Sequence, residues 1–429
     1  MSMPLVNVPA GLDTELFCLG AGALKYLPEV LQKAFPGRSA FIVADENTYL
    51  AAGKAAKKFL KDASFPVAGE YIFPGTPVLH PDYAYCKLLA EKFPENCVPV
   101  AIGSGVINDL TKCASSLKNL RYCCVPTACS VDGFTSAGAA LSVEGNKRTV
   151  KCPAPKALCA DSDILATAPP EMFASGFADL LTKVPAGADW VIADLTGEEP
   201  IRKDVWDLIQ GNIRKWIADK NDMAAVFDGL AATGYSMQMY QESRPASGAE
   251  HLFSHVWEME GLTKDGKDVS HGFKVGVGAV ASTMLMEYVI ENEYDDLAGR
   301  MKPGLSFEER SAEIDQLLVK NCYGTAPKET ALKKHLTGEK LAERRNLIRK
   351  QWKKMQTALR ERLIPSDELI KILRDAGCPT TAKEIGLDKE QFLHGIKTAQ
   401  LIRNRYTIID MLYETGLLDD ALKKLDVMC

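Results

Sequence analysis

Three of the chain's six histidines lie close together in the sequence. The segment GAEHLFSHVWEM contains His251 and His255, and the segment SHGFKVGVG contains His271. Ser247 and Glu250 have the S-x-x-E spacing of a capping box, so a helix is predicted to begin at Ser247. His251 and His255 then lie one turn apart on the same face of this helix. Neutral imidazole is the commonest protein ligand for divalent transition metals, and the pattern therefore indicates a candidate metal site.

A second helix and one upstream carboxylate could complete this site. Ser270 is predicted to cap a helix that starts at His271. A carboxylate usually joins imidazoles around such a metal, and Asp179 in the segment GFADLLTK is the candidate. The alternative is an ordinary helix-face pair of histidines with the third histidine beside a cap. The third histidine together with Asp179 favours the metal site.

Asp179 is also four residues before Lys183, in a helix that is predicted to start near Pro169 and Pro170. An aspartate–lysine pair at this spacing is most often a surface ion pair. The apolar residues of the segment GFADLL leave little room for a broad solvent face, which weakens that interpretation. Beyond Pro170 the sequence shows no convincing strand, so residues 166–429 are predicted to form an all-helical domain with a charged helical tail.

The first 165 residues alternate short apolar, β-rich runs with helical runs. Strands are predicted in SAFIVADENTY, FPVAGEYIF, VPVAIG and RYCCVP, and helices in AAGKAAKKFLKD and in the residues that follow GSG. Strands that alternate with helices predict a parallel sheet with helices on both faces, an α/β nucleotide-binding domain. Ligands of such sheets bind outside the carboxyl ends of the strands.

The segment GSGVIND follows one of these predicted strands and leads into a helix. Gly103, Ser104 and Gly105 therefore lie where free N–H groups and the helix dipole favour a pyrophosphate. The segment is not a GxGxxG fingerprint, and a tight turn without any ligand is the alternative. Asp109 would repel a phosphate that it faced, so it is expected to point towards a ribose or a neighbouring loop.

Asp45 lies at the end of an earlier predicted strand. Its carboxylate can accept hydrogen bonds from an adenosine ribose, or it can cap the helix that begins near Asn47. A 2′-phosphate at this place would meet like charge, because Glu46 follows and no arginine lies close behind. The sequence therefore predicts that NADH is preferred to NADPH.

Composition excludes several classes of protein. A chain of 429 residues with 46% hydrophobic content can bury two cores, which predicts two domains. A net charge of −5 argues against a nucleic-acid or membrane-surface binder. No signal peptide is evident, and the apolar run GVGAVASTMLMEYVI is too short to span a bilayer and is predicted to form a buried helix. Twelve cysteines without a CxxC pair indicate a reduced, cytoplasmic chain.

Five segments together resemble a known family. In order, GSGVIND, PTACSVDGFTS, GFADLLTK, GAEHLFSHVWEM and SHGFKVGVG resemble the iron-type alcohol dehydrogenase and dehydroquinate synthase superfamily. Within it they resemble the sn-glycerol-1-phosphate dehydrogenases, including the bacterial AraM branch. The resemblance extends from about Phe41 to Val280 and covers the helical tail less clearly. It implies a Rossmann-like N-terminal domain and an all-helical C-terminal domain, with the active-site cleft between them.

The resemblance also implies roles for single residues. The implied metal ligands are Asp179, His251 and His271. The implied contacts of the dinucleotide, the last two of them on the nicotinamide side, are Gly103, Ser104, Gly105, Asp109, Thr127 and Ser130. The residues implied near the substrate are Asp132, which would hold it or its proton, His255, which lies in the cleft without ligating, and Lys183, a cation for a phosphate.

The implied reaction is the metal-dependent, reversible reduction of dihydroxyacetone phosphate to sn-glycerol 1-phosphate. The alkoxide that forms would collect a proton from water or from His255. The implied cofactors are NAD(H), with NADP(H) as an alternative, and one divalent ion, zinc or nickel, with iron also compatible with the ligands. A small-molecule substrate and a homo-oligomer, with a dimer favoured, are the expected partners.

Three other functions remain as alternatives. They are a dehydroquinate synthase-like cyclase, a glycerol dehydrogenase that acts on an unphosphorylated polyol, and a non-catalytic relative that only binds metal or nucleotide. The segment EHLFSHVWEM argues against the cyclase. The presence of all three ligand positions argues against the non-catalytic relative.

Overall fold

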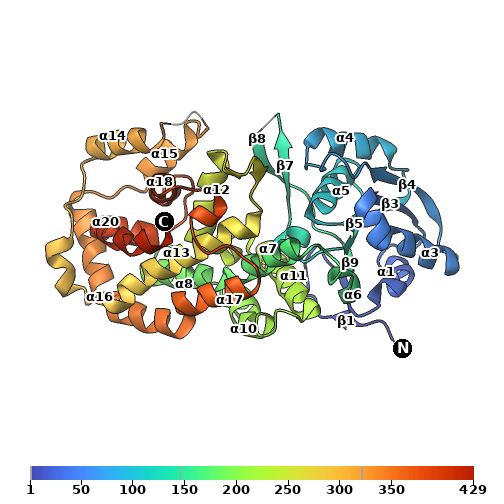
Figure 1. Cartoon of the computed structure of the whole chain (residues 1–429), viewed down its shortest axis with the longest axis horizontal. Helices are drawn as coiled ribbons and strands as arrows, with labels where there is room; N and C mark the ends of the chain where they lie inside the picture. The colour runs from blue at the N-terminus through green and yellow to red at the C-terminus, as the bar shows by residue number, and fades with distance from the viewer. Residues whose placement is uncertain (1, 145, 320–321) are drawn as a thin grey trace. The chain divides into compact units, whose positions relative to one another are not determined.

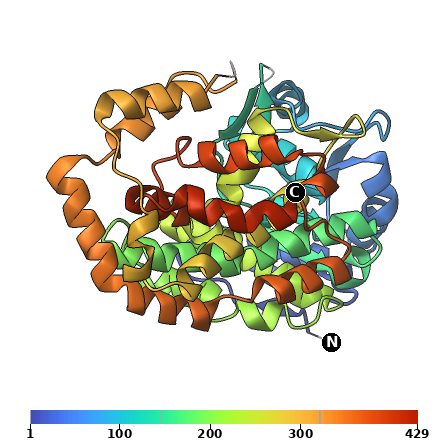
Figure 2. The same cartoon turned by 60° about the vertical axis from the view of Figure 1, so that its left-hand side comes forward.

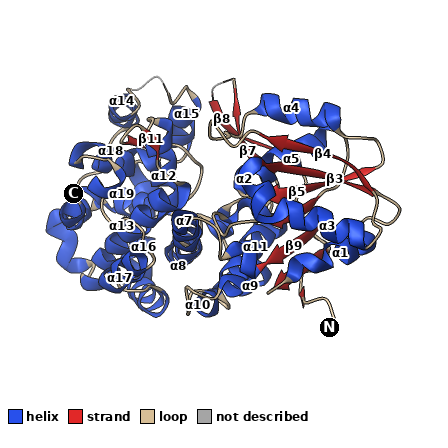
Figure 3. Cartoon of the chain, turned by 45° about the vertical axis from the view of Figure 1, so that its right-hand side comes forward, coloured by secondary structure: helices blue, strands red, loops and turns tan. Residues whose placement is uncertain are grey.

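The computed structural model describes residues 2–144, 146–319 and 322–429. The chain forms two compact units, one of Met1–Leu180 with Arg214–Glu242 and one of Leu181–Ile213 with Ser243–Cys429 (Figure 1). This division falls later than the sequence-based boundary after residue 165, and the first unit also takes in residues 214–242. Strands gather in the first unit, whereas the second unit is almost entirely helical (Figure 3).

A seven-stranded sheet forms the centre of the first unit. Its strand order is β1-β2-β9-β6-β5-β3-β4, and all neighbours pair in parallel except β1 with β2. The sheet confirms the predicted parallel α/β architecture. Its strands are β1 (Leu5–Val6), β2 (Leu16–Gly20), β3 (Ser39–Asp45), β4 (Val67–Phe73), β5 (Cys97–Gly103), β6 (Cys123–Pro126) and β9 (Ala157–Asp161).

Helices and one hairpin complete this unit. An antiparallel hairpin of β7 (Ala139–Val143) and β8 (Asn146–Val150) lies outside the main sheet. The helices of eight or more residues are α1 (Leu27–Ala34), α3 (Lys54–Asp62), α4 (Tyr83–Lys92), α5 (Gly105–Leu117), α7 (Pro170–Leu181) and α11 (Met223–Tyr240). The shorter pieces are η1 (Ala23–Tyr26), α2 (Glu46–Thr48), η2 (Tyr49–Gly53), η3 (Asp132–Phe134), α6 (Ser162–Leu165) and α10 (Ile213–Trp216), the last across the boundary of the units.

The alternation of side chains in β3 explains why helices cover both faces of the sheet. Ile42 belongs to a buried cluster with Val30 of α1 and Leu60 of α3. The neighbouring Phe41 faces the other way, and its ring meets Phe93, just after α4, at 5.3 Å between centroids. Successive side chains of a strand point to opposite faces, so a strand of apolar residues needs a helix layer on each side.

The secondary structure of the second unit is helical apart from one short hairpin. Those of eight or more residues are α8 (Lys183–Leu195), α9 (Lys203–Gln210), α12 (Ala249–Met259), α13 (His271–Glu291), α14 (Phe307–Leu317), α15 (Ala326–Lys333), α16 (Gly338–Arg362), α17 (Ser366–Asp375), α18 (Lys389–Ala399) and α19 (Ile408–Thr415). The shorter ones are η4 (Arg244–Ala246), η5 (Asp295–Arg300), η6 (Lys383–Ile385), α20 (Leu418–Ala421) and η7 (Leu422–Met428). One prediction was wrong in detail, because β10 (Thr263–Lys264) and β11 (Lys267–Asp268) form a hairpin of two residues in each strand.

Helix α13 is the central helix of this unit. It packs against α12, α16, α17 and the final turn η7, and Figure 2 shows the orange and red C-terminal segments around it. Among the described residues it is the single helix long and apolar enough to cross a membrane, but 78% of that apolar window is buried inside the structure. This burial agrees with its prediction as a core helix.

The basic region of residues 328–365 contains the long helix α16. Its buried residues include Leu341, Ile348, Trp352 and Leu359, which recur at helical spacing. The remaining surface is rich in lysine and arginine, and Arg349 pairs with Asp295 at 2.8 Å. Helix α16 therefore buries one apolar face and exposes a charged one, in agreement with the predicted charged helical tail.

Candidate metal centre and active site

Helix α12 carries two of the three candidate histidines. It begins at Ala249 with Gly248 as its N-cap, so the predicted start at Ser247 was wrong. The capping box does not form because the Glu250 carboxylate accepts the N–H of Gly248, at 2.7 Å, instead of that of Ser247. The Ser247 hydroxyl instead accepts a hydrogen bond from Arg405 at 2.7 Å. A distant arginine therefore replaced the local interaction that the sequence pattern suggested.

Glu250 orients the imidazole of His251. Its Oε1 lies 2.8 Å from Nδ1 of His251, and both side chains are buried. Burial opposes ionisation of Glu250, but its interaction with His251 and the N–H of Gly248 keep the pKa of this carboxyl below its usual value. An ionised carboxylate only accepts hydrogen bonds, so Nδ1 donates to it, and in the neutral imidazole that a metal requires Nε2 carries the lone pair. Histidine ligands of metals commonly have such an outer carboxylate.

Helix α13 begins at His271 as predicted. The Ser270 hydroxyl accepts the N–H of Phe273 at 3.4 Å and caps the helix. The His271 ring lies 5.4 Å from the His251 ring and 6.5 Å from the His255 ring, measured between centroids. The fold therefore brings His251, His255 and His271 together.

Glu258 lies among these groups. Its carboxylate is 2.8 Å from Nζ of Lys274 and 3.6 Å from Nδ1 of both His255 and His271. Burial opposes its ionisation, but the two imidazoles and the lysine hold the pKa of Glu258 far below its usual range. Solvent reaches 36% of the His255 side chain, yet desolvation lowers the pKa of His255 to about 4. The ring is therefore neutral near pH 7.

Asp179 lies near the C-terminal end of α7. Its Oδ2 accepts the backbone N–H of Asp132 at 2.9 Å, which ties this carboxylate to the loop that follows β6. Gly176 lies one turn earlier, and a Cβ there would lie 1.9 Å from the carbonyl oxygen of Cys129. Ser175 adds a hydrogen bond to the carbonyl oxygen of Ser130 at 3.3 Å. The helix and the loop are thus in backbone contact.

Asp179, His251 and His271 could hold a metal ion. Each offers one ligand atom, and the three atoms lie within 4.8 Å of one another. One carboxylate oxygen and two imidazole nitrogens are suitable donors for a divalent transition metal. His255 is not part of this group.

The glycine turn after β5 is tightly packed. A Cβ at Gly103 would lie 2.5 Å from Cβ of Ile107, and one at Gly105 would lie 3.2 Å from Val131. Helix α5 starts at Gly105, so its first N–H groups point out of the helix start, as a phosphate site requires. Thr127 donates its N–H to the carbonyl oxygen of Gly103 at 3.1 Å, which holds the loop after β6 beside the turn.

Asp109 points towards a neighbouring segment, one of the two alternatives left open by the sequence. Its Oδ2 accepts the N–H of Ala140 in β7 at 3.1 Å, and its Oδ1 lies 3.4 Å from Nζ of Lys112. The buried Lys112 also donates to the carbonyl oxygens of Gly133 and Gly138, at 3.0 and 2.9 Å. Asp109 and Lys112 therefore brace the loop after β6 and the hairpin that follows it.

Asp45 caps the short helix α2. Its Oδ1 accepts the N–H of Thr48 at 2.9 Å, and the Thr48 hydroxyl in turn accepts the N–H of Asp45 at 3.1 Å. This is the capping role that was the alternative to a ribose contact. The cap occupies one carboxylate oxygen, and the preference for NADH stays a prediction.

Lys183 is fully buried. It is the first residue of α8, whereas Asp179 belongs to α7, so the prediction that both lie in one helix was wrong. Helix α7 ends at Leu181, and Thr182 occupies the N-cap position of α8. The backbone of Thr182 is itself helical (φ −62°, ψ −18°). The Lys183 ammonium donates to the Thr182 hydroxyl at 3.3 Å.

Comparisons with known proteins show the family of the chain. Residues 18–169 match the family model described as iron-containing alcohol dehydrogenase. The chain is 30% identical to the glycerol-1-phosphate dehydrogenase, NAD(P)+, of Bacillus velezensis over 420 residues, 95% of this chain and 93% of that protein. It is 35% identical to the enzyme of the same name from Halalkalibacterium halodurans over 292 residues, 66% of this chain and 72% of that protein. The chain belongs to the glycerol-1-phosphate dehydrogenase family.

Solved structures support the fold of this glycerol-1-phosphate dehydrogenase family member. An iron-containing alcohol dehydrogenase from Thermococcus thioreducens has a TM-score of 0.58 at 15% identity, over 96% of this chain and 98% of that chain. A glycerol dehydrogenase from Schizosaccharomyces pombe has a TM-score of 0.56 at 15% identity, over 100% of this chain and 92% of that chain. The Rossmann-like and helical architecture predicted from the resemblance is therefore confirmed.

Sequence reasoning missed four charged residues around the site. Glu250 was interpreted as part of a capping box, and no role was predicted for Glu258, Lys274 or Lys112. The position of Glu250 directly before the candidate ligand His251 could have indicated that its carboxylate binds this imidazole. Glu258 lies one turn after His255, a spacing that could have indicated it. Nothing local distinguishes Lys112 or Lys274 from ordinary helix lysines.

The second unit also contains a cavity of about 700 Å³ among its tail helices. Its lining includes Lys334, which pairs with Asp410 at 2.6 Å, and Arg344, which lies 3.4 Å from Glu414. Because these cations already have acidic partners, the lining does not select a ligand of one charge. We assign it no ligand.

Proposed function

We propose that the chain catalyses the reversible reduction of dihydroxyacetone phosphate to sn-glycerol 1-phosphate, with NAD(H) or NADP(H) and a divalent metal ion. The observation that carries this proposal is the group of Asp179, His251 and His271, in a chain of the glycerol-1-phosphate dehydrogenase family. The names of the relatives supply the product and the cofactor class.

The donor set fits a divalent metal such as zinc, nickel or iron. Three protein ligands would leave open coordination positions for the substrate. A metal held there supplies Lewis-acid stabilisation for the substrate carbonyl oxygen. Glu250 supports this role because it fixes the proton of His251 on Nδ1 and leaves Nε2 as the ligand atom. The backbone N–H of Asp132 donates to Oδ2 of Asp179 and so helps to hold this carboxylate in place.

The proposed cofactor site is the turn of Gly103, Ser104 and Gly105 with the start of α5. Helix N–H groups without acceptors inside the helix favour the pyrophosphate. Thr127 and Ser130 are proposed to flank the nicotinamide, which supplies the hydride. Asp45 is proposed to meet the ribose with the carboxylate oxygen that does not cap α2, while Asp109 acts indirectly by bracing the loop.

The proposed substrate residues are Lys183, Asp132 and His255. Lys183 offers a positive charge for the phosphate, and its burial would make a charge-assisted hydrogen bond strong. The backbone N–H of Asp132 holds Asp179, and the Asp132 side chain is proposed to orient the substrate hydroxyl. His255 is neutral near pH 7 and is proposed to relay a proton from water to the product oxygen, taking one up at one ring nitrogen as it gives one from the other.

An assay of NADH oxidation tests this function. Purified protein loaded with Zn²⁺ or Ni²⁺ should oxidise NADH when dihydroxyacetone phosphate is added, and the product should be sn-glycerol 1-phosphate by chiral analysis. Dihydroxyacetone should be a poor substrate, because it lacks the phosphate. Turnover of dihydroxyacetone alone would support a glycerol dehydrogenase, and formation of the sn-3 enantiomer would contradict the proposal.

The contribution of Lys183 can be measured with two substrates. Lys183→Met keeps most of the buried stem but removes the charge, so KM for dihydroxyacetone phosphate should rise about tenfold or more, since a charged hydrogen bond contributes roughly 1.5–3 kcal/mol. KM for dihydroxyacetone should change little. Lys203→Ala, which removes an exposed lysine of the same unit, is the control. Equal effects of Lys183→Met on both substrates would instead give Lys183 a structural role.

The compartment and the oligomeric state are also proposals. The twelve cysteines all lie among the described residues, none of them is in a disulfide bond, and ten of them are buried. Free thiols in this number support a reducing compartment, and we propose the cytoplasm. A homodimer stays a prediction.

A further inference from the structure

One buried carboxylate joins the starts of two helices in the second unit. Asp189 lies in α8 and is fully buried. Its Oδ2 accepts the N–H of Ala249, the first residue of α12, at 2.7 Å. Its Oδ1 accepts the N–H of Ile408, the first residue of α19, at 2.6 Å. The first N–H groups of a helix have no acceptor within it, so a single side chain here satisfies two helices that are far apart in the sequence.

The tail segment just before α19 contacts the same region a second time. Nη1 of Arg405 donates to the carbonyl oxygen of Ser247 at 2.8 Å and to its hydroxyl at 2.7 Å. Nη2 of Arg405 donates to the Ser243 hydroxyl at 3.0 Å. Ser247 lies directly before Gly248, the N-cap of α12. The guanidinium therefore fixes the chain at the point where it enters α12.

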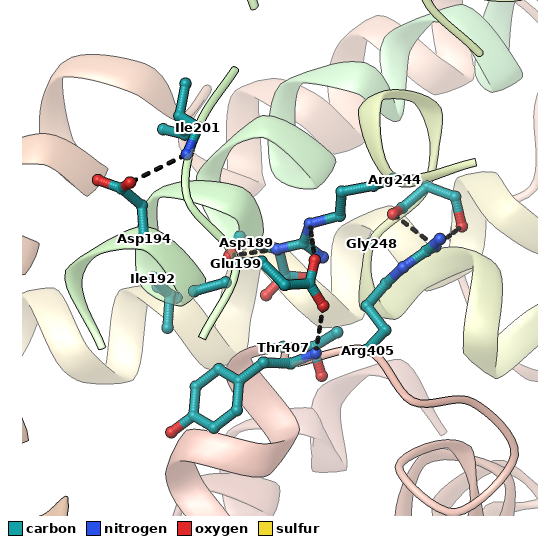
Figure 4. Close-up of polar contacts among 12 residues, drawn as sticks. Asp189, Ile192, Asp194, Glu199, Ile201, Arg244, Gly248, Arg405 and Thr407 are labelled. Atoms are coloured by element: carbon teal, nitrogen blue, oxygen red, sulfur yellow. Dashed lines mark hydrogen bonds and ion pairs between the residues drawn. The ribbon is translucent and has the colours of Figure 1, made fainter. Parts of the chain in front are cut away.

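A third contact runs through Glu199. Its Oε1 accepts the N–H of Tyr406 at 3.1 Å, and its Oε2 lies 2.8 Å from Nε of Arg244. Arg244 in turn donates to the carbonyl oxygen of Asp189 at 3.0 Å. Figure 4 shows Asp189, Glu199 and Arg244 together, beside Arg405 of the tail. Arg405 thus contacts the residue before the N-cap of α12, Ile408 is joined to the first residue of α12 through Asp189, and Tyr406 is joined to Asp189 through Glu199 and Arg244.

The start of α12 has little freedom to move. A Cβ on Gly248 would lie 2.6 Å from Oδ2 of Asp189 and 2.8 Å from Oε2 of Glu250. Glu250 binds Nδ1 of His251 with its other oxygen. Any shift of the first turn of α12 therefore moves Glu250 and the His251 ring together.

We infer that the C-terminal tail from Arg405 onward positions the metal-ligand helix α12, and that Asp189 is the positioning residue that transmits this. The inference rests on the proposed metal site at His251. It gives the helical tail a role in metal binding without any tail residue in the ligand group. Groups that orient a metal ligand typically change metal affinity by 10- to 100-fold when they are removed.

The first experiment changes Asp189. Asp189→Asn keeps the shape, but the amide can accept only one of the two N–H groups and directs its NH₂ at the other. Asp194→Asn is a matched control on the same helix, because Asp194 also accepts a backbone N–H, that of Ile201 at 3.0 Å, away from α12 (Figure 4). Co²⁺ affinity, measured by competition with a chelator, should fall about tenfold in Asp189→Asn and stay unchanged in Asp194→Asn.

The second experiment changes the tail. Proline is favoured at the first position of a helix, so Ile408→Pro removes the N–H that Asp189 accepts while α19 can still form. Thr407 before it is already extended (φ −136°, ψ 177°), as a residue before proline should be. Ile408→Ala is the control, because it removes the buried side chain but keeps the N–H. Ile408→Pro should weaken Co²⁺ binding more than Ile408→Ala.

The visible absorption spectrum of the Co²⁺ protein separates positioning from general stability. Asp189→Asn and Ile408→Pro should change the d–d absorption bands of bound Co²⁺. The control variants Asp194→Asn and Ile408→Ala should keep the wild-type spectrum even if their melting temperatures fall. Wild-type affinity and spectrum in Asp189→Asn and Ile408→Pro would overturn the inference while the metal site stands. Failure of the wild-type protein to bind Co²⁺ would overturn the proposed metal site itself, and the inference with it.

Discussion

Replacing His251 with alanine is expected to abolish stoichiometric metal binding. The change removes one of three ligands and leaves Glu250 without the imidazole that it binds. Because Lewis-acid stabilisation contributes several kcal/mol, activity with dihydroxyacetone phosphate should fall on the order of a thousandfold. Elemental analysis after dialysis measures the metal, and NADH oxidation measures the rate.

His394→Ala is the matched control for this experiment. His394 lies in the same unit and binds Glu260 at 2.9 Å, but it is not part of the candidate ligand group. It should keep one metal ion per chain and wild-type activity. Stoichiometric metal in His251→Ala, with an intact fold by circular dichroism, would refute the ligand assignment.

Gly176→Ala should destabilise the first unit more than an ordinary helix substitution. The added Cβ would lie 1.9 Å from the Cys129 carbonyl oxygen and 3.0 Å from the Ser130 nitrogen, and both are backbone atoms that cannot rotate away. Overpacking of this kind costs on the order of 3 kcal/mol or more, although alanine has the higher helix propensity. Urea unfolding measures the loss of stability.

The loop that Gly176 contacts also carries the proposed nicotinamide contact Ser130 and the Asp132 N–H that binds Asp179. Gly176→Ala should therefore also raise KM for NADH. Gly299→Ala is the control, because a Cβ at Gly299 meets nothing within 4 Å. An unfolding midpoint in Gly176→Ala equal to that of the wild type would show that α7 can move away from the loop at little cost.

The sequence by itself determined the fold class, the ligand candidates and the family. Periodicity sufficed for the sheet because β-rich runs such as VPVAIG are buried on both faces, and such strands have a strong local signal. His251 and His271 were predicted as candidate ligands because three histidines in a short span, together with Asp179, favour a metal site. The family followed from five ordered segments and is confirmed by relatives that extend over the tail.

Only the tertiary structure decided how these residues are held. Ser247 and Glu250 had the local pattern of a cap, yet Arg405 and Gly248 became their partners. Which hydrogen bond the Ser247 hydroxyl forms depends on Arg405, which is 158 residues away in the sequence. No local pattern encodes such a partner, because a side-chain hydrogen bond contributes only about 1 kcal/mol and packing selects among the alternatives.

The same reason explains Asp189 and Asp45. Asp189 looks like any helix aspartate in the sequence, and only the packed structure brings the starts of α12 and α19 to its two oxygens. The sequence allowed Asp45 either to bind a ribose or to cap a helix, and in the structure one of its carboxylate oxygens accepts the capping N–H of Thr48. Local spacing determines which residues can do chemistry, but buried polar groups must find partners wherever the chain brings them, and that depends on the whole fold.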